Sequence, residues 1–435
     1  MRGFDFEEFG KSNHKRSISS IMLSLIVCLS FVAHLFFCSI SATAYLTLLS
    51  FFTIVYIISK PVILFDKNIV VVLVVFELSI IFSFLRSQRS SGSLIDVLVL
   101  FLGIFIVIFF TCEMEDYSGM MNIILFFSLF FAVGTILNVL LPGIHSAILS
   151  FFPSSYSSVV RQQAVNRIPG FSTNPGFSAG YITAGILVVV ADTKRYKRIN
   201  KSHIIPLSVL LFSLLLTGKR GPTIFLILTL FLCYLIPIRG IQKVKRYWRL
   251  FLVVLVVFIL FFAFNELLVD IPVVSEINRT ITGILAGEDV SSGRNRLYAW
   301  AIQLFLRHPI FGIGWGDYKT TVVGNATLIK ELDTHNIYLQ LLCETGIFGF
   351  LIAAVSFFLL WNRAKNAYKE CIANDNPEIQ SMLPFVYFSF AYQTCFLLFG
   401  LTGNTLYDQH YQILYMISCA ITMTYNYKIY TINRY

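Results

Sequence analysis

The sequence predicts an all-α polytopic integral membrane protein. Hydrophobic residues make up 57% of its 435 residues and charged residues only 13%, whereas soluble globular proteins contain roughly 45–50% and about 25%. The mean hydropathy is +0.75, and Phe alone occurs 43 times. A chain with so little charge cannot cover a water-facing surface. The composition therefore argues against a soluble enzyme, a disordered tail and a secreted disulfide scaffold.

Apolar runs of the right length occur twelve times, since a bilayer core requires about 20 predominantly apolar residues per helix. They lie near residues 18–40, 42–59, 69–85, 94–111, 120–141, 176–191, 203–217, 221–238, 248–268, 337–361, 383–402 and 407–425. We therefore expect about 12 transmembrane helices in three parts. Residues 1–268 hold helices 1–9, residues 269–336 form a large outer loop with an amphipathic helix, and residues 337–435 hold helices 10–12.

The positive charges predict the orientation. Of the 33 Lys and Arg residues, 21 fall on the side of the N-terminus and 12 on the other side, 6 of them in the long loop. Because loops of that length do not count in the positive-inside rule, both termini are expected in the cytoplasm. The net charge of +10 is then explained by topology and by anionic membrane lipids, with no nucleic acid as a partner.

Lys219 and Arg220 lie on the outer side, in a tight Thr-Gly-Lys-Arg-Gly-Pro turn between two predicted spans. Cations placed there oppose the predicted orientation, and two interpretations are open. The side chains reach towards the membrane interface, or they form an anion site at the outer boundary. Arginine suits an anion site because its planar fork binds phosphate oxygens in pairs and keeps its proton.

Arg167 directly precedes a segment rich in Pro and Gly, residues 168–177, just before a predicted span. This composition predicts a non-helical path at membrane depth. Such backbone is tolerated there only where it is buried in protein or lines a cavity. A purely structural turn is the alternative explanation.

Arg294 opens a predicted amphipathic helix in the long loop. Its apolar stripe repeats at i, i+3, i+4, i+7 and i+8 and consists of Leu297, Trp300, Ala301, Leu304 and Phe305. Ser291 or Ser292 is the expected N-cap. We expect this helix on the outer interface, with its N-terminus available to an anion. A solvated Arg294 is the alternative.

His335 stands where the long loop re-enters the membrane. It is either a cap or packed polar residue, or a proton acceptor near neutral pH. Glu331 and Asp333 offer carboxylates to a divalent metal, but the outer loops contain no second acidic motif to complete the site. The sequence therefore argues against a metal site there. Glu77 and Glu344 lie within predicted spans and are expected to make interhelical hydrogen bonds. Glu344 falls about half a helical turn around from His335 and is not expected to face the same site.

The order of these motifs resembles the superfamily of bacterial O-antigen ligases and Wzy-type O-antigen polymerases. From Arg294 the chain reads R-x-R-x-x-x-W, then H-P-I-F-G-I-G-W-G-D-Y, then T-H-N-I-Y-L-Q-L-L-C-E-T-G-I-F-G. The T-G-K-R-G-P and R-I-P-G-F segments resemble elements that precede these in the superfamily. The resemblance covers about residues 160–360. It implies that the large loop between helices 9 and 10 is periplasmic.

This resemblance implies a metal-independent glycosyltransferase of the bacterial inner membrane, without a cofactor. The donor would be an undecaprenyl-pyrophosphate-linked oligosaccharide, and a chain-length regulator and a flippase of the same pathway would be partners. The expected catalytic residues are His335, Arg220 and Arg294. The expected substrate-binding residues are Arg167, Lys219, Arg296, Asn336 and Tyr338. Sugar pockets would be built from outer aromatic residues such as Trp315, Tyr318 and Tyr338.

The type of transfer depends on one departure from the ligase pattern. Residues 174–177 read Asn-Pro-Gly-Phe, whereas ligases tend to carry Asn-Pro-Asn there, so the chain looks more like the polymerase branch. A polymerase of O-antigen, capsule or exopolysaccharide is favoured, and a ligase acting on lipid A-core is the alternative. A transporter of lipid-linked sugar is a less favoured alternative, because it would place cations inside the central spans. A structural scaffold is also disfavoured, because it would not require arginines beside broken segments at one membrane face.

Overall fold

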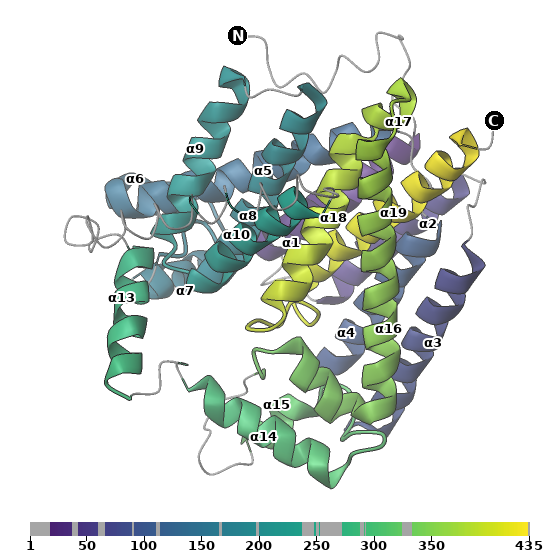
Figure 1. Cartoon of the computed structure of the whole chain (residues 1–435). Coiled ribbons are helices and arrows are strands. Elements are labelled where there is room, and N and C mark those ends of the chain that lie inside the picture. The colour runs from purple at the N-terminus through teal and green to yellow at the C-terminus, as the bar shows by residue number, and fades with distance from the viewer. Residues whose placement is uncertain are drawn as a thin grey trace. The chain divides into compact units, whose positions relative to one another are not determined.

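The computed structural model of the chain is built from α-helices (Figure 1). It describes residues 18–36, 42–59, 66–88, 91–109, 114–164, 168–196, 200–236, 248, 252, 272–287, 291, 293–323 and 333–433. None of these residues lies in a strand.

Every predicted span except 248–268 coincides with a helix. The helices are α1 (Ile18–Phe36), α2 (Ala42–Ser59), α3 (Lys67–Arg86), α4 (Ser91–Phe109), α5 (Met114–Leu140), α8 (Pro175–Tyr196), α9 (Lys201–Leu216), α10 (Arg220–Leu235), α16 (Ile337–Ala373), α18 (Leu383–Phe399) and α19 (Gln409–Ile432). Among the described residues, 4 helices, in α3, α5, α8 and α16, are long and apolar enough to cross a membrane. Shorter apolar helices lie in α1, α2, α4, α9, α10 and α18.

These helices confirm an all-helical membrane protein with several spans. The count of twelve stays a prediction, because the span 248–268 lies outside the described residues apart from Trp248 and Leu252. The three-part division of the chain and the cytoplasmic position of both termini also stay predictions.

The chain divides into two compact units. The first unit consists chiefly of residues 124–290 and 368–391, where α8 packs against α9 and α10. The second consists chiefly of residues 5–123, 291–367 and 392–435, where α4 packs against α2, α3 and α19. Arg220 belongs to the first unit, and both Arg294 and His335 belong to the second.

The long loop contains more structure than the one predicted helix. It holds α13 (Pro272–Leu285), α14 (Arg294–Arg307) and α15 (Asp317–Val323). The predicted apolar stripe of α14 is confirmed, but it faces protein: Leu297, Ala301 and Leu304 are buried in a cluster with Tyr318 and Cys343. The helix therefore sits on the start of α16, where its stripe is covered without lipid.

Helix α16 is broken at Gly346, which has a φ of 67° and a ψ of −171°. The break frees two carbonyl groups, and the loop before α15 binds them: Ile313 N donates to Cys343 O at 2.9 Å, and Gly314 N donates to Glu344 O at 3.0 Å. A Cβ atom on Gly346 would lie 2.6 Å from the backbone nitrogen of Gly312, and one on Gly312 would lie 2.6 Å from that of Gly346. Both positions require glycine because backbone approaches backbone there.

The expectation for Glu77 is wrong. This residue of α3 is 5% exposed, and neither carboxyl oxygen has a hydrogen-bond partner among the described residues. No interhelical hydrogen bond from Glu77 is therefore observed there.

Candidate functional site

The backbone at His335 has an unusual conformation. Its φ is 55°, and among the described residues it is the one non-glycine residue with a positive φ. The adjacent residues close a turn around it: Asn336 N donates to Thr334 Oγ1 at 3.1 Å, and the Thr334 hydroxyl donates to Asn336 O at 2.7 Å. His335 itself is half-buried. The turn therefore presents the imidazole from a backbone that has little freedom.

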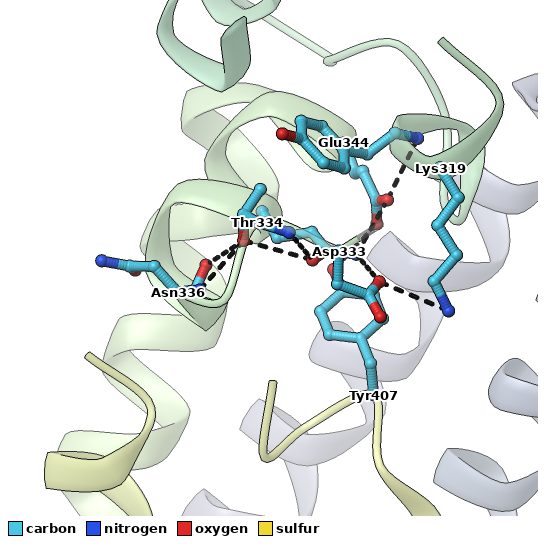
Figure 2. A network of polar contacts seen from close by, with 8 residues as sticks. Lys319, Asp333, Thr334, Asn336, Glu344 and Tyr407 are labelled. Carbon is cyan, nitrogen blue, oxygen red and sulfur yellow. Dashed lines mark hydrogen bonds and ion pairs between the residues drawn. The ribbon is translucent and has the colours of Figure 1, made fainter. Parts of the chain in front are cut away.

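A buried amide holds this turn within the polar network around Asp333, Thr334 and Glu344 that Figure 2 shows. The amide is that of Gln340, in the first turn of α16, and this residue is 0% exposed. Its Oε1 lies 3.2 Å from both the nitrogen and the hydroxyl of Thr334. Its Nε2 donates to Asp333 Oδ1 at 3.0 Å and to Glu344 Oε1 at 3.3 Å. Gln340 thus connects the residues on the N-terminal side of His335 to the interior of α16.

Glu344 is the second hub of the network. It is 0% exposed, and it accepts hydrogen bonds from the Tyr407 hydroxyl at 2.8 Å and from Tyr318 N at 3.3 Å. Its expected interhelical bonding is confirmed by Tyr318 N, which lies in α15. Gln340 joins Glu344 to Thr334, and the separation of Glu344 from the His335 site stays a prediction.

Lys319 supplies the positive charge of this network. Its Nζ lies 3.3 Å from Asp333 Oδ1. Burial lowers the pKa of Lys319, but the charges of Asp333, Asp96 and Glu344, together with the hydrogen bond to Asp333, outweigh that effect and leave the pKa above its usual value. Lys319 therefore remains a cation beside the His335 turn at neutral pH.

Arg294 lies one helical turn from a residue that contacts the His335 loop. The hydroxyl of Tyr298 in α14 donates to His335 O at 3.4 Å. Burial raises the pKa of Tyr298, and the charge of Arg294 opposes this rise, as expected for neighbours at i and i+4. The first turn of α14 therefore lies beside the His335 backbone, and a shared catalytic site of Arg294 and His335 stays a prediction.

The N-terminus of α14 is capped in a way that the sequence only partly predicts. The N-cap position is Gly293, with a φ of 83°. The Ser291 hydroxyl nevertheless accepts a hydrogen bond from Asn295 N at 3.1 Å, so one predicted serine does satisfy an N-terminal donor. Arg296, in the same turn, is exposed.

Two predicted substrate-binding residues also have structural partners. The Asn336 side chain caps α16 by accepting from Tyr338 N at 3.0 Å and from Leu339 N at 3.1 Å. The Tyr338 hydroxyl donates to Leu397 O at 2.7 Å. Their contact with substrate stays a prediction.

The aromatic residues expected to line sugar pockets are packed inside the second unit. Trp315 is 1% exposed and stacks on Tyr407 with ring centroids 4.7 Å apart. Tyr318 is 0% exposed, and its hydroxyl donates to Leu297 O. Neither ring presents a face to a sugar in this conformation, so that expectation is wrong for both residues.

In the first unit, Lys219 precedes α10 and Arg220 is its first residue. The Arg220 guanidinium donates to the Thr280 hydroxyl of α13, and Gly218 in the turn lies against Pro272 at the start of α13. Arg220 is thus half-buried beside the long loop. Because it belongs to the other unit, its meeting with Arg294 and His335 stays a prediction.

Arg167 lies outside the described residues, but the segment that follows it has the predicted irregular path. Three successive carbonyls are bound by different elements: Ser178 Oγ of α8 donates to Pro169 O, His145 Nε2 binds Gly170 O at 2.8 Å, and the Tyr156 hydroxyl donates to Phe171 O. His145 lies in α6 (Pro142–Leu149) and Tyr156 in α7 (Ser154–Ala164). This backbone is buried in protein, as the sequence predicts.

The residues that sequence analysis missed are chiefly those that hold His335. Gln340 and Glu344 stand at i and i+4 on one helix face, which was the available signal. Among the described residues, no group of three His, Cys, Asp or Glu side chains is arranged to hold a metal ion. Independence from metal stays a prediction.

The fold and the candidate residues together define a multi-pass helical membrane protein in which Arg220 and Arg294 begin helices and His335 directly precedes the cap of another. Residues 205–354 match the family model described as O-antigen ligase. This match places that region of the chain in the O-antigen ligase and polymerase superfamily, whose members are glycosyltransferase-like enzymes. The matched region includes Arg220, Arg294 and His335. No curated protein matches the chain.

Proposed function

We propose that the chain is a polysaccharide polymerase of the bacterial inner membrane. It transfers a glycan chain from undecaprenyl pyrophosphate onto the next lipid-linked repeat unit at the periplasmic face. The glycan belongs to an O-antigen, a capsule or an exopolysaccharide.

The observation that carries this proposal is the contact of Tyr298 with His335. It places the first turn of α14, which carries Arg294, beside the backbone of His335 within one unit. A cation for the pyrophosphate leaving group and a base for the acceptor hydroxyl are the two groups that suit glycosyl transfer from a pyrophosphate.

The chemistry follows from the charges. The acceptor hydroxyl attacks the anomeric carbon of the donor sugar, a new C–O bond forms, and the C–O bond to pyrophosphate breaks. His335 takes the hydroxyl proton. Arg294, with Arg167 and Arg220, stabilises the negative charge that develops on the departing undecaprenyl pyrophosphate, since paired hydrogen bonds to phosphate suit arginine.

The polymerase assignment rests on the Asn-Pro-Gly-Phe sequence at residues 174–177. A ligase that transfers the chain to lipid A-core is the second candidate, and the description of the matching family favours it. The two candidates share a donor and differ in the acceptor.

Deletion of the chromosomal gene, followed by gel electrophoresis of surface polysaccharide, separates these functions. Loss of a polymerase leaves a single repeat unit on lipid A-core and accumulates single lipid-linked units. Loss of a ligase leaves bare core and accumulates long lipid-linked chains. Unchanged polysaccharide contradicts both.

A further inference from the structure

The left-handed backbone at His335 requires support from its surroundings. Side chains with a Cβ rarely adopt a positive φ, and such a conformation persists where neighbouring structure holds it. The Thr334–Asn336 turn alone is short and lies at the end of a loop. The support must therefore come from what binds Thr334.

Gln340 binds Thr334 with an amide whose oxygen and nitrogen are both engaged. Its Oε1 accepts from Thr334 N and lies 3.2 Å from the Thr334 hydroxyl, whose single hydrogen is shared with Asn336 O. Both hydrogens of Nε2 are directed to carboxylates, those of Asp333 and Glu344. An amide offers two donor hydrogens and two acceptor lone pairs. Exchanging its oxygen and nitrogen would place N–H against the Thr334 N–H, so its orientation is fixed.

Glu344 anchors the other end of this chain of contacts. Its oxygens accept from Gln340, Tyr318 N and Tyr407, and each of these groups comes from a different segment. Figure 2 shows Tyr407, Glu344 and Thr334 in one network, and Gln340 supplies the link between Glu344 and Thr334. The position of Thr334 is thereby set by the packed interior of the second unit.

We propose that Gln340, held by Glu344, is a positioning residue for His335. This inference rests on the proposed function. Gln340 is 0% exposed, so it does not touch substrate and acts through the backbone on either side of His335. Without its amide, Thr334 is released, the backbone at His335 relaxes to a negative φ, and the imidazole turns away from the acceptor.

The test compares purified full-length variants in nanodiscs, with lipid-linked glycans extracted from the deletion strain as the substrate. Gln340→Met keeps the length of the side chain and removes the amide. Gln393→Met is the matched control: Gln393 is also 0% exposed, and its Nε2 donates to Thr422 Oγ1 at 2.9 Å in the same unit. Folded protein is quantified by fluorescence-detected size-exclusion chromatography, and kcat and KM are measured per folded molecule.

We expect kcat of Gln340→Met to fall about 100-fold, since a displacement of about 1 Å at a reacting group costs that much. KM for the glycan should stay within about twofold, because ground-state binding is unchanged. Gln393→Met should lower the amount of folded protein and leave kcat unchanged. Equal kcat values for the two variants, or a Gln340→Met effect confined to KM, would overturn the proposal.

Conservative variants supply a second readout. Glu344→Gln retains a carbonyl oxygen for Gln340 and should keep kcat within a few-fold, whereas Glu344→Leu should match Gln340→Met. Thr334→Val should lose kcat and Thr334→Ser should retain it, which tests the same contacts if Gln340→Met does not fold. A fully active Thr334→Val overturns the proposal.

His335→Ala separates the positioning role from the proposed function. If His335→Ala is inactive while Gln340→Met is active, the positioning role of Gln340 is refuted and the proposed function stands. A fully active His335→Ala removes the imidazole from the chemistry, and the positioning role falls with it.

Discussion

Replacing Gly346 by Ala tests whether the break in α16 depends on the absence of a side chain. Its φ of 67° and ψ of −171° fall in a region that is nearly exclusive to glycine, where another residue costs about 1–3 kcal/mol. The new Cβ would also lie 2.6 Å from Gly312 N and closer still to the Ile310 carbonyl. Because these are backbone atoms, the loop must move away as a whole.

The magnitude follows from the contacts that such a movement breaks. Three backbone hydrogen bonds join the loop to the break, from Ile313 to Cys343, from Gly314 to Glu344 and from Ile347 to Pro309. At about 1 kcal/mol each, their loss and the conformational cost together reach about 4–6 kcal/mol. The thermal midpoint should therefore fall by about 4–7 °C, given about 2.1 cal/mol/K of unfolding entropy per residue.

Gly287→Ala is the matched control. Gly287 also has a positive φ, 70°, but a Cβ there would meet no atom within 4 Å. Its cost should be about 1–2 kcal/mol, a shift of about 1–2 °C. Both variants are heated in detergent and the remaining monodisperse protein is measured by size-exclusion chromatography. Equal midpoints for the two variants would refute the role of backbone contact at Gly346.

Two further predictions concern the charged groups. Arg294→Ala should abolish polymer formation and Arg294→Lys should retain only a small part of it, because lysine lacks the paired donors; Arg307→Ala, at the exposed far end of α14, should remain active on the polysaccharide gel. Burial lowers the pKa of His145 below its ordinary 6.5, despite the opposing hydrogen bond to Gly170. The folded state therefore favours the neutral imidazole, and stability is lost as pH falls below 6.5. The thermal midpoint should fall between pH 7 and about 5.5, and that of His145→Phe should fall less; equal pH dependence would contradict this.

Periodicity in the sequence predicted the helices and the buried stripe of α14, because an apolar face must be covered wherever the helix packs. Periodicity did not predict what covers the stripe of α14. The expected neighbour was the membrane interface, whereas the structure packs the stripe against protein. Helix α13 carries Ile277, Ile281 and Leu285 at i, i+4 and i+8. This repeat is the signal in the sequence for a second amphipathic helix within the long loop.

The surroundings of His335 were less predictable. Asn336 caps α16 and leaves His335 outside it, so helical spacing counted from His335 does not predict where Glu344 lies. A single positive φ at a residue other than glycine leaves no pattern in the sequence. The hydrogen bonds of Gln340 bring together positions that only the folded chain makes adjacent.

The glycine-to-glycine approach of the 308–317 loop and residues 343–347 has a practical consequence for chimeric enzymes. Exchanging the long loop between a polymerase and a ligase is a natural way to locate acceptor choice. A graft that carries one of these two segments without the other would place two backbones from different proteins in direct contact. Their hydrogen bonds and close approach would then no longer match. Exchanged together, they should transplant as a single piece and leave the membrane helices of the recipient undisturbed.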